Sequence, residues 1–228
     1  MKPFVIFLFA ISSISLKAQN DMKLIYVGDP MCSWCYGIAP EWNKLKSEYQ
    51  NKMEFEYVMG GLRPYFDKPM SEMKDFLSDH WKHVNEASGQ EFNYGILDRS
   101  DLNYDTEPPS RAVVVVKALQ PSAVDVFFKG IQKLFYLKNK DMNKSESYHE
   151  LLSDTDIDID STAFDNLFHT KEIKEATKAE FDNAKLLGVT SFPTVILQIG
   201  EEYFIVAQGY STQDKMSQTI EKLIARTR

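Results

Sequence analysis

The chain of 228 residues contains only two cysteines, Cys32 and Cys35, which excludes a small fold held together by several disulfides. Positive charge is not in excess either, because 26 Lys and Arg stand against 33 Asp and Glu, a net charge of −7. Such an acidic balance argues against a groove for nucleic-acid phosphates. The sequence has no glycine-rich phosphate-binding loop and no serine nucleophile motif, so we expect no cofactor and no serine hydrolase.

Long apolar runs are also missing, except at the N-terminus. Lys2 is followed by an apolar stretch over 4–11, and small residues lead to Ala18. This pattern is typical of a cleavable secretory signal, which we place at 1–18; an ordinary first strand or an unstructured start is the alternative. We therefore expect a periplasmic or secreted protein with no stable membrane association.

The rest of the chain predicts an α/β fold. The residues at 23–27 and 53–59 have the pattern of strands, and 41–49 between them has apolar residues at helical spacing. A strand hairpin and a last helix, capped by Ser211, end the chain. Between these two parts the pattern is helical, with candidate helices that begin near Met73 and at 110–119, 124–137, 145–152 and 171–187; the hairpin strands are 194–197 and 203–206.

The two cysteines stand in the sequence Cys32-Ser33-Trp34-Cys35, where the first strand gives way to the helix. A disulfide between them closes so short a loop that it would stabilise the fold by only about 2 kcal/mol. As a reversible couple the spacing is suitable, because unpaired N–H groups at a helix start favour a thiolate. We predict that Cys32 is the exposed nucleophile, which an alkylating reagent modifies first, and that Cys35 is the resolving thiol. Asp29 and Glu41 are expected to be solvated.

A zinc site is the main alternative for these cysteines. His80 and His83 would complete a set of two cysteines and two histidines, but 45 residues separate the pairs. We therefore predict no metal site.

A second motif, 188–194, precedes the late hairpin. Pro193 stands just before an apolar strand, where it removes a hydrogen-bond donor. A cis Phe192–Pro193 bond would make a tight turn there, and a trans proline at the strand start is the alternative. In the cis form, the Phe192 backbone would face the cysteines and pair with an extended peptide.

These two motifs together resemble those of DsbA-family thioredoxin-fold proteins, and the chain is most similar to the FrnE-like group. The resemblance extends over essentially the whole mature chain, including Gly60-Gly61-Leu62-Arg63-Pro64 and Pro109-Ser110-Arg111-Ala112. It implies a thioredoxin-like fold with a large all-helical insertion between the second and third core strands. The boundaries we predict are 1–18 for the signal, 19–65 and 188–228 for the two parts of the core, and 66–187 for the insertion.

The resemblance also implies thiol–disulfide exchange with protein or peptide thiols and an unknown recycling partner. Cys32, Cys35 and Pro193 would be catalytic, and we assign Ser33, Trp34 and Phe192 to substrate contacts. Ser33-Trp34 matches neither the Pro-His pair of strong oxidases nor the Gly-Pro pair of thioredoxins, so the redox direction stays open. A glutathione-dependent isomerase or transferase of small aromatic molecules is the alternative enzyme. A metal-binding or holdase-like interaction protein is the non-enzymatic alternative.

Overall fold

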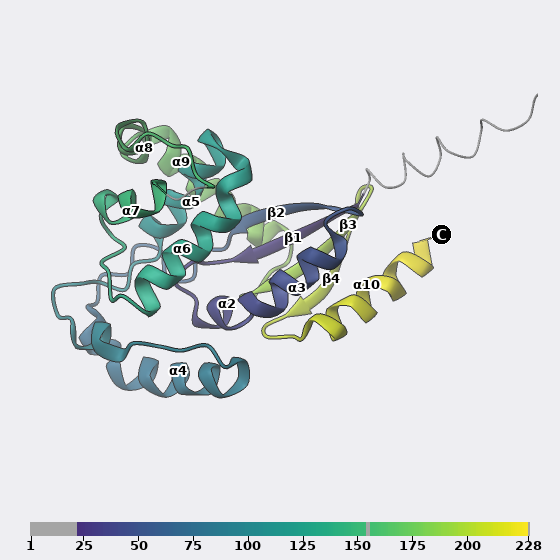
Figure 1. Cartoon of the computed structure of the whole chain (residues 1–228), viewed down its shortest axis with the longest axis horizontal. Coiled ribbons are helices and arrows are strands. Elements are labelled where there is room, and N and C mark those ends of the chain that lie inside the picture. Colours follow the sequence, from purple (N-terminus) through teal and green to yellow (C-terminus); the bar gives the residue numbers. More distant parts are fainter. Residues whose placement is uncertain (1–21, 154–155, 228) are drawn as a thin grey trace, which may run out of the picture.

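The computed structural model describes residues 22–153 and 156–227, so the predicted signal at 1–18 lies outside the described residues. A four-stranded sheet with the order β2-β1-β3-β4 forms the centre (Figure 1). Strand β1 pairs in parallel with β2 and antiparallel with β3, and β3 and β4 form the predicted hairpin. The strands are β1 (Met22–Gly28), β2 (Glu54–Met59), β3 (Thr194–Ile199) and β4 (Glu202–Gln208).

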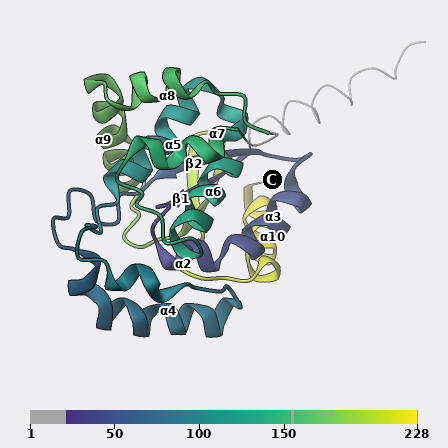
Figure 2. The same cartoon turned by 60° about the vertical axis from the view of Figure 1, so that its left-hand side comes forward.

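Helices fill the interval between β2 and β3, which confirms the helical insertion predicted from the sequence. The α-helices of the described residues are α2 (Ser33–Gly37), α3 (Ala39–Tyr49), α4 (Lys74–Ser88), α5 (Glu107–Leu119), α6 (Val124–Tyr136), α7 (His149–Leu152), α8 (Ser161–Phe168), α9 (Lys171–Leu186) and α10 (Gln213–Thr227). Short 3-10 helices at η1 (Met70–Met73), η2 (Tyr94–Asp98), η3 (Pro121–Ala123) and η4 (Ser145–Tyr148) connect them. The short helix α2 lies between α4 and α6 (Figure 2).

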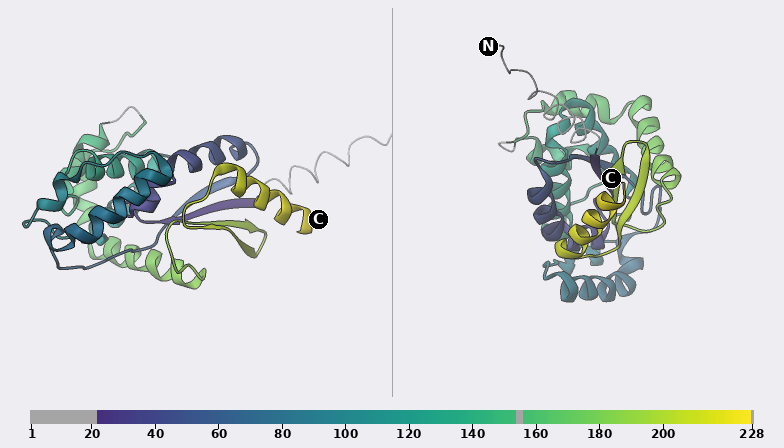
Figure 3. Two further views of the ribbon diagram at one scale, coloured as in Figure 1. Left: turned by 90° about the horizontal axis from the view of Figure 1, so that it is seen from below. Right: turned by 90° about the vertical axis from the view of Figure 1, so that its right-hand side faces the viewer.

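Alternation along β1 sends apolar side chains to both faces of the sheet. Leu24 and Tyr26 belong to the larger core, which packs under α3, α6 and α10. Ile25 and Val27 belong to a smaller core, which Ala184 of α9 helps to cover from the other side (Figure 3). A strand buried on both faces reads as a continuous apolar run, and 24–27 has this pattern.

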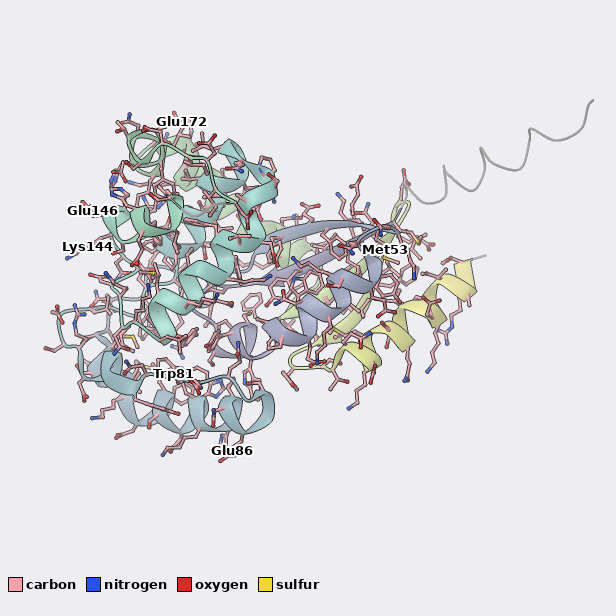
Figure 4. The ribbon with its side chains drawn as sticks, viewed as in Figure 1. Met53, Trp81, Glu86, Lys144, Glu146 and Glu172 are labelled. Atoms are coloured by element: carbon pink, nitrogen blue, oxygen red, sulfur yellow. The ribbon has the colours of Figure 1, made fainter. Side chains whose placement is uncertain are left out.

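The insertion shares its core with the sheet. Residues 112–116 of α5 are buried on every side, which confirms the prediction of a helix in a segment whose valines favour strands. Trp81 points from α4 toward the rest of the molecule, whereas Glu86 points to the opposite side of the same helix (Figure 4). One contiguous cluster of buried side chains includes Trp81, Phe135 of α6 and Tyr26 of the sheet.

The outer edge of β2 is occupied by side chains from the insertion. Glu180 of α9 accepts the N–H of Met59 at 3.0 Å, and Lys117 of α5 donates to the carbonyl of Tyr57 at 3.0 Å. Lys117 and Glu180 also form an ion pair at 2.7 Å. Two backbone groups that an edge strand would leave open therefore have partners.

Three local predictions differ from the structure. The helix expected after the cysteines is divided, because α2 ends at Gly37 and α3 begins after Ile38. The last helix begins at Gln213 rather than after a Ser211 cap, and its first N–H donates to Glu41 at 2.7 Å. Glu41 is thus not simply solvated, since it also accepts a hydrogen bond from Lys44.

The predicted boundary at 187 places α9 in the insertion, although α9 packs directly against the sheet. The boundaries themselves stay a prediction. Within residues 22–153 and 156–227, every helix is too short or too polar to span a bilayer.

Candidate active site

Cys32 is the N-cap residue of α2, directly after the turn that ends β1. Its backbone is extended, with φ −83° and ψ 118°, and its carbonyl accepts the N–H of Tyr36 at 3.0 Å. The following N–H groups begin the helix and have no earlier helical carbonyl to bind. The Cys32 side chain therefore lies at the positive end of the helix dipole, where a thiolate is stabilised.

Cys35 lies one turn further into the protein and is fully enclosed. Both cysteines are free thiols in this structure. Burial raises the pKa of the Cys35 thiol well above its ordinary value, and the hydrogen bond to Cys32 and the charge of Cys32 raise it further. Hydrogen bonding with the Asp29 backbone and the Tyr26 side chain acts in the opposite direction and lowers this pKa. Cys35 is thus held as a protonated thiol behind Cys32.

The loop before β3 meets the cysteines from the other side. The Phe192–Pro193 peptide bond is cis, as the sequence predicts. The Cys32 thiol donates a hydrogen bond to the Phe192 carbonyl at 3.8 Å, across 160 positions of sequence. The structure therefore brings Cys32, Cys35 and Pro193 to one place.

The expected exposure of Cys32 is wrong. Cys32 is only 5% exposed, while Cys35 is 0% exposed. The Phe192 carbonyl of the proline loop lies 3.8 Å from the Cys32 sulfur and contributes to this burial. The order in which the two thiols react with an alkylating reagent stays a prediction.

Asp29 is also not solvated, because its side chain is completely buried. Its Oδ1 accepts the N–H of Met31 at 2.8 Å, and its Oδ2 accepts the N–H of Leu62 at 2.8 Å. Burial raises the pKa of this carboxyl to about 6, against the lowering effect of these hydrogen bonds and of one from Thr106. Asp29 therefore ties the cysteine turn to the loop after β2.

The predicted substrate-contact residues have different surroundings. Ser33 is buried, whereas Trp34 and Phe192 are partly exposed. The Trp34 ring lies edge-on to His80, with 6.0 Å between ring centroids, and at the same distance from Tyr210. Aromatic side chains from α4 and from the loop before α10 thus flank the cysteine motif.

The histidines do not join the cysteines in a metal site. Across residues 22–153 and 156–227, no group of three or more His, Cys, Asp or Glu side chains is arranged to hold a metal ion. His80 packs between Trp34 and Phe76, and burial lowers its pKa.

Sequence patterns did not reveal three tyrosines around the site. Tyr26 donates from β1 to the Cys35 carbonyl at 3.3 Å, and Tyr104 and Tyr136 donate from the insertion to the Met31 carbonyl, each at 2.7 Å. Tyr26 lies in the strand that leads to the cysteine motif, so its position near the cysteines could have been predicted from the sequence. Tyr104 and Tyr136 are 73 and 105 positions from Met31, so only the fold brings them there.

Comparison with known proteins agrees with this geometry. A family model described as thioredoxin matches residues 25–217. The chain is similar to a candidate protein disulfide isomerase from Nitrosomonas europaea, with 28% identity and a TM-score of 0.82, covering 91% of this chain and 99% of that one.

More distant structures share the fold. The cytosolic disulfide reductase DsbM from Pseudomonas aeruginosa is 22% identical with a TM-score of 0.69, covering 89% of this chain and 98% of that one. The oxidoreductase DsbA from Xylella fastidiosa is 10% identical with a TM-score of 0.59, over 92% and 88% of the two chains.

One curated relative also matches, the ClpXP adapter protein SpxH of Shouchella clausii, at 20% identity over 187 residues and 80% of this chain. The chain spans 59% of the length of that protein. The match over 25–217, the sheet with its helical insertion and the cysteine turn facing a cis-proline lead to one assignment. The chain belongs to the thioredoxin family and has the architecture of the DsbA-family oxidoreductases.

Proposed function

We propose that the protein is a thiol–disulfide oxidoreductase that acts on protein or peptide substrates through Cys32 and Cys35. The observation that carries the proposal is the position of Cys32. Its sulfur lies at a helix start, 3.8 Å from the carbonyl that precedes cis-Pro193, with a second thiol buried one turn behind it. A structural disulfide or metal ligand would not need this combination of a helix dipole and an adjacent resolving thiol.

The exchange proceeds in two balanced steps. In the reducing direction, the Cys32 thiolate attacks one sulfur of a substrate disulfide and forms a mixed disulfide with it. The substrate S–S bond breaks, and its other sulfur leaves as a thiolate that takes a proton. The Cys35 thiolate then attacks the Cys32 sulfur and releases the second substrate thiolate, which takes a proton. Two electrons pass to the substrate, and the protein is left with a Cys32–Cys35 disulfide. The same steps in reverse oxidise a substrate dithiol.

The mixed disulfide itself activates Cys35. After burial, the two strongest causes of its raised pKa are the hydrogen bond and the charge of Cys32. Both causes disappear when the Cys32 sulfur is bonded to a substrate, while the hydrogen bonds with Asp29 and Tyr26 remain. We therefore expect the resolving thiol to be easier to ionise in the mixed disulfide than in the free protein.

An extended peptide is the substrate form that fits this site. A peptide that pairs with the backbone at Phe192 would place a sulfur next to Cys32, and Trp34 offers a partly exposed ring at the rim. The recycling partner stays unknown, and a glutathione buffer is the first one to test, because the structurally similar DsbM has been solved with GSH.

Trapping the mixed disulfide tests the proposal. We expect Cys35→Ser to accumulate a covalent adduct through Cys32 when mixed with a disulfide-containing protein, because the resolving step is blocked. Cys32→Ser is expected to form no adduct and to lose turnover. Mass spectrometry of the adduct and circular dichroism of both variants are the measurements.

Full turnover by a folded Cys32→Ser protein would overturn this function. The alternative glutathione-dependent isomerase or transferase is tested at the same time, because transfer to a small aromatic molecule does not require Cys35. Under that alternative, Cys35→Ser would keep its activity and trap no protein.

From the cysteine and proline motifs we also infer membership of the FrnE-like group.

The N-terminal pattern around Lys2 and Ala18 supports export to the periplasm. The DsbM structure is that of a cytosolic protein, so the location has its own test. N-terminal sequencing of protein from a periplasmic fraction should begin at Gln19. Recovery of the uncut chain from the cytosol would contradict export.

A further inference from the structure

Both backbone groups of Met31, the residue before Cys32, are bound by side chains. Met31 is completely buried, and its N–H donates to Asp29 at 2.8 Å. Its carbonyl accepts one hydrogen bond from the hydroxyl of Tyr104 and one from Tyr136, each at 2.7 Å. A carbonyl oxygen has two lone pairs, so this one is fully used.

Packing fixes the direction of the two hydroxyls. The Tyr104 ring stacks on Phe135 with 6.1 Å between centroids, and the Tyr136 ring stacks on Tyr36 at 4.8 Å. Tyr36 belongs to α2, the helix that Cys32 begins. Tyr136 therefore contacts the residue before the cysteine through its hydroxyl and the following turn through its ring.

These hydrogen bonds affect the charge around Cys32. The Met31 carbonyl belongs to the peptide unit that carries the Cys32 N–H, and the negative end of an unbound carbonyl disfavours a nearby thiolate. Two O–H groups directed at that oxygen offset its dipole, and the effect is strong in a buried site of low dielectric. Burial is the largest cause of the raised pKa of both tyrosines. The charge of Cys32 raises the pKa of each one further, which is consistent with a position near its sulfur.

We propose that Tyr104 and Tyr136 are positioning residues through which the helical insertion orients the Met31–Cys32 peptide and favours the thiolate of Cys32. This inference rests on the proposed function, because it concerns the reactivity of the same cysteine. The other titratable groups near Cys32 are Cys35 from α2, Tyr26 from β1 and Asp29 after β1, and the charged Arg63 after β2 lies 5.9 Å from the Tyr104 ring.

Phenylalanine substitutions test the two hydroxyls while keeping the rings. Tyr104→Phe and Tyr136→Phe each remove one hydrogen bond, and the double variant leaves the buried Met31 carbonyl without either. Tyr148→Phe is the matched control. Tyr148 is a completely buried tyrosine of the same insertion, and its hydroxyl donates to the Met142 carbonyl, away from the cysteines.

The first measurement is the alkylation rate of Cys32 by iodoacetamide as a function of pH. The full chain carries Cys35→Ser, so that only Cys32 reacts. At pH values where the alkylation rate still rises with pH, we expect it to fall about five-fold for each single variant and at least about ten-fold for the double variant. The midpoint of the curve of rate against pH should move to higher pH. Tyr148→Phe should keep the parent profile.

The second measurement uses the intact cysteine pair in glutathione buffers. Loss of thiolate stabilisation should shift the equilibrium toward the Cys32–Cys35 disulfide by about five-fold for each hydroxyl removed. Should the double variant fail to fold, the two single variants decide the question by the same two measurements.

Unchanged pH profiles in the folded Tyr104→Phe and Tyr136→Phe proteins would overturn the inference. An equal loss in Tyr148→Phe would also overturn it, because the effect would then be a general loss of stability. Alkylation needs no substrate, so this result is independent of turnover. A shifted profile in a protein that exchanges no disulfides would contradict the proposed function and leave this inference standing.

Discussion

At the scale of single residues, Asp29 joins three segments of the chain. Its buried carboxyl accepts hydrogen bonds from Met31 in the cysteine turn, from Leu62 after β2 and from Thr106 at the start of α5. Burial outweighs these bonds, so the folded protein binds a proton at Asp29 more tightly than the unfolded chain does. A group whose pKa is raised by folding makes the folded state less stable as pH rises.

We expect this effect to appear in the difference between the wild type and Asp29→Asn. The pKa rises from 3.8 to about 6, so the Asp29 contribution to the free energy of unfolding is full below pH 3.8 and declines as pH rises through about 6. The wild type should lose up to about 3 kcal/mol relative to Asp29→Asn between pH 4 and pH 7. Urea unfolding of both proteins across this range measures the difference.

Asp101→Asn is the control for this experiment. Asp101 is paired with Arg99, whose hydrogen bond lowers the pKa of the carboxyl to about 2. Its effect has the opposite sign, since stability from this pair is present above the unfolded pKa and is lost as pH falls. A stability difference for Asp29→Asn that does not change with pH would contradict the raised pKa.

At the scale of elements, the end of β2 lies against the proline loop. A Cβ atom added at Gly60 would come within 2.1 Å of the Phe192 ring. Gly60 is thus the position at which the second strand can pass under Phe192, whose carbonyl faces Cys32.

Gly60→Ala should therefore displace the proline loop. We expect a loss of about 1–3 kcal/mol in the free energy of unfolding, which is usual for overpacking, together with slower disulfide exchange. Denaturant unfolding and the rate of mixed-disulfide formation are the two measurements. Gly130→Ala is the control, because its added Cβ meets the end of the Leu151 side chain at 2.7 Å, away from the cysteines.

The two variants should separate stability from activity. Gly130→Ala is expected to keep its exchange rate, whatever its stability. Normal exchange by Gly60→Ala would show that the position of Phe192 does not matter for the reaction.

Sequence patterns predicted most elements because their cues are local. Alternating or continuous apolar residues identified the strands, and Pro108-Pro109 marked the start of α5. The cysteine motif and Pro193 were visible for the same reason. The break at Ile38, the burial of Asp29 and the tyrosine hydroxyls on Met31 depend on contacts between distant segments, which no local pattern carries.

At the scale of the whole molecule, the sheet and the insertion share one hydrophobic core. Tyr26 of the sheet packs against Phe128 of α6, and the buried cluster continues without interruption to Trp81 of α4. Among the described residues, the buried side chains of the insertion belong to the same cluster as those of the sheet, so we expect the two parts to unfold together.

We expect a single unfolding transition for the whole chain. Both curves are recorded on one Trp34→Phe/Trp81→Phe protein. Its far-ultraviolet circular dichroism reports mostly on the helices, and its fluorescence reports on Trp42, which packs against Tyr26 and Tyr57 of the sheet. The two urea curves should coincide, as they do for cooperative domains. Two separate midpoints would show that the insertion is an independent unit.

The Lys117–Glu180 pair on β2 also has a consequence for how molecules of this protein meet. The N–H of Met59 and the carbonyl of Tyr57 are already bonded to these two side chains. Pairing of a second chain with this edge of the sheet requires displacement of a partly buried ion pair. The Lys117–Glu180 pair therefore opposes edge-to-edge aggregation at β2.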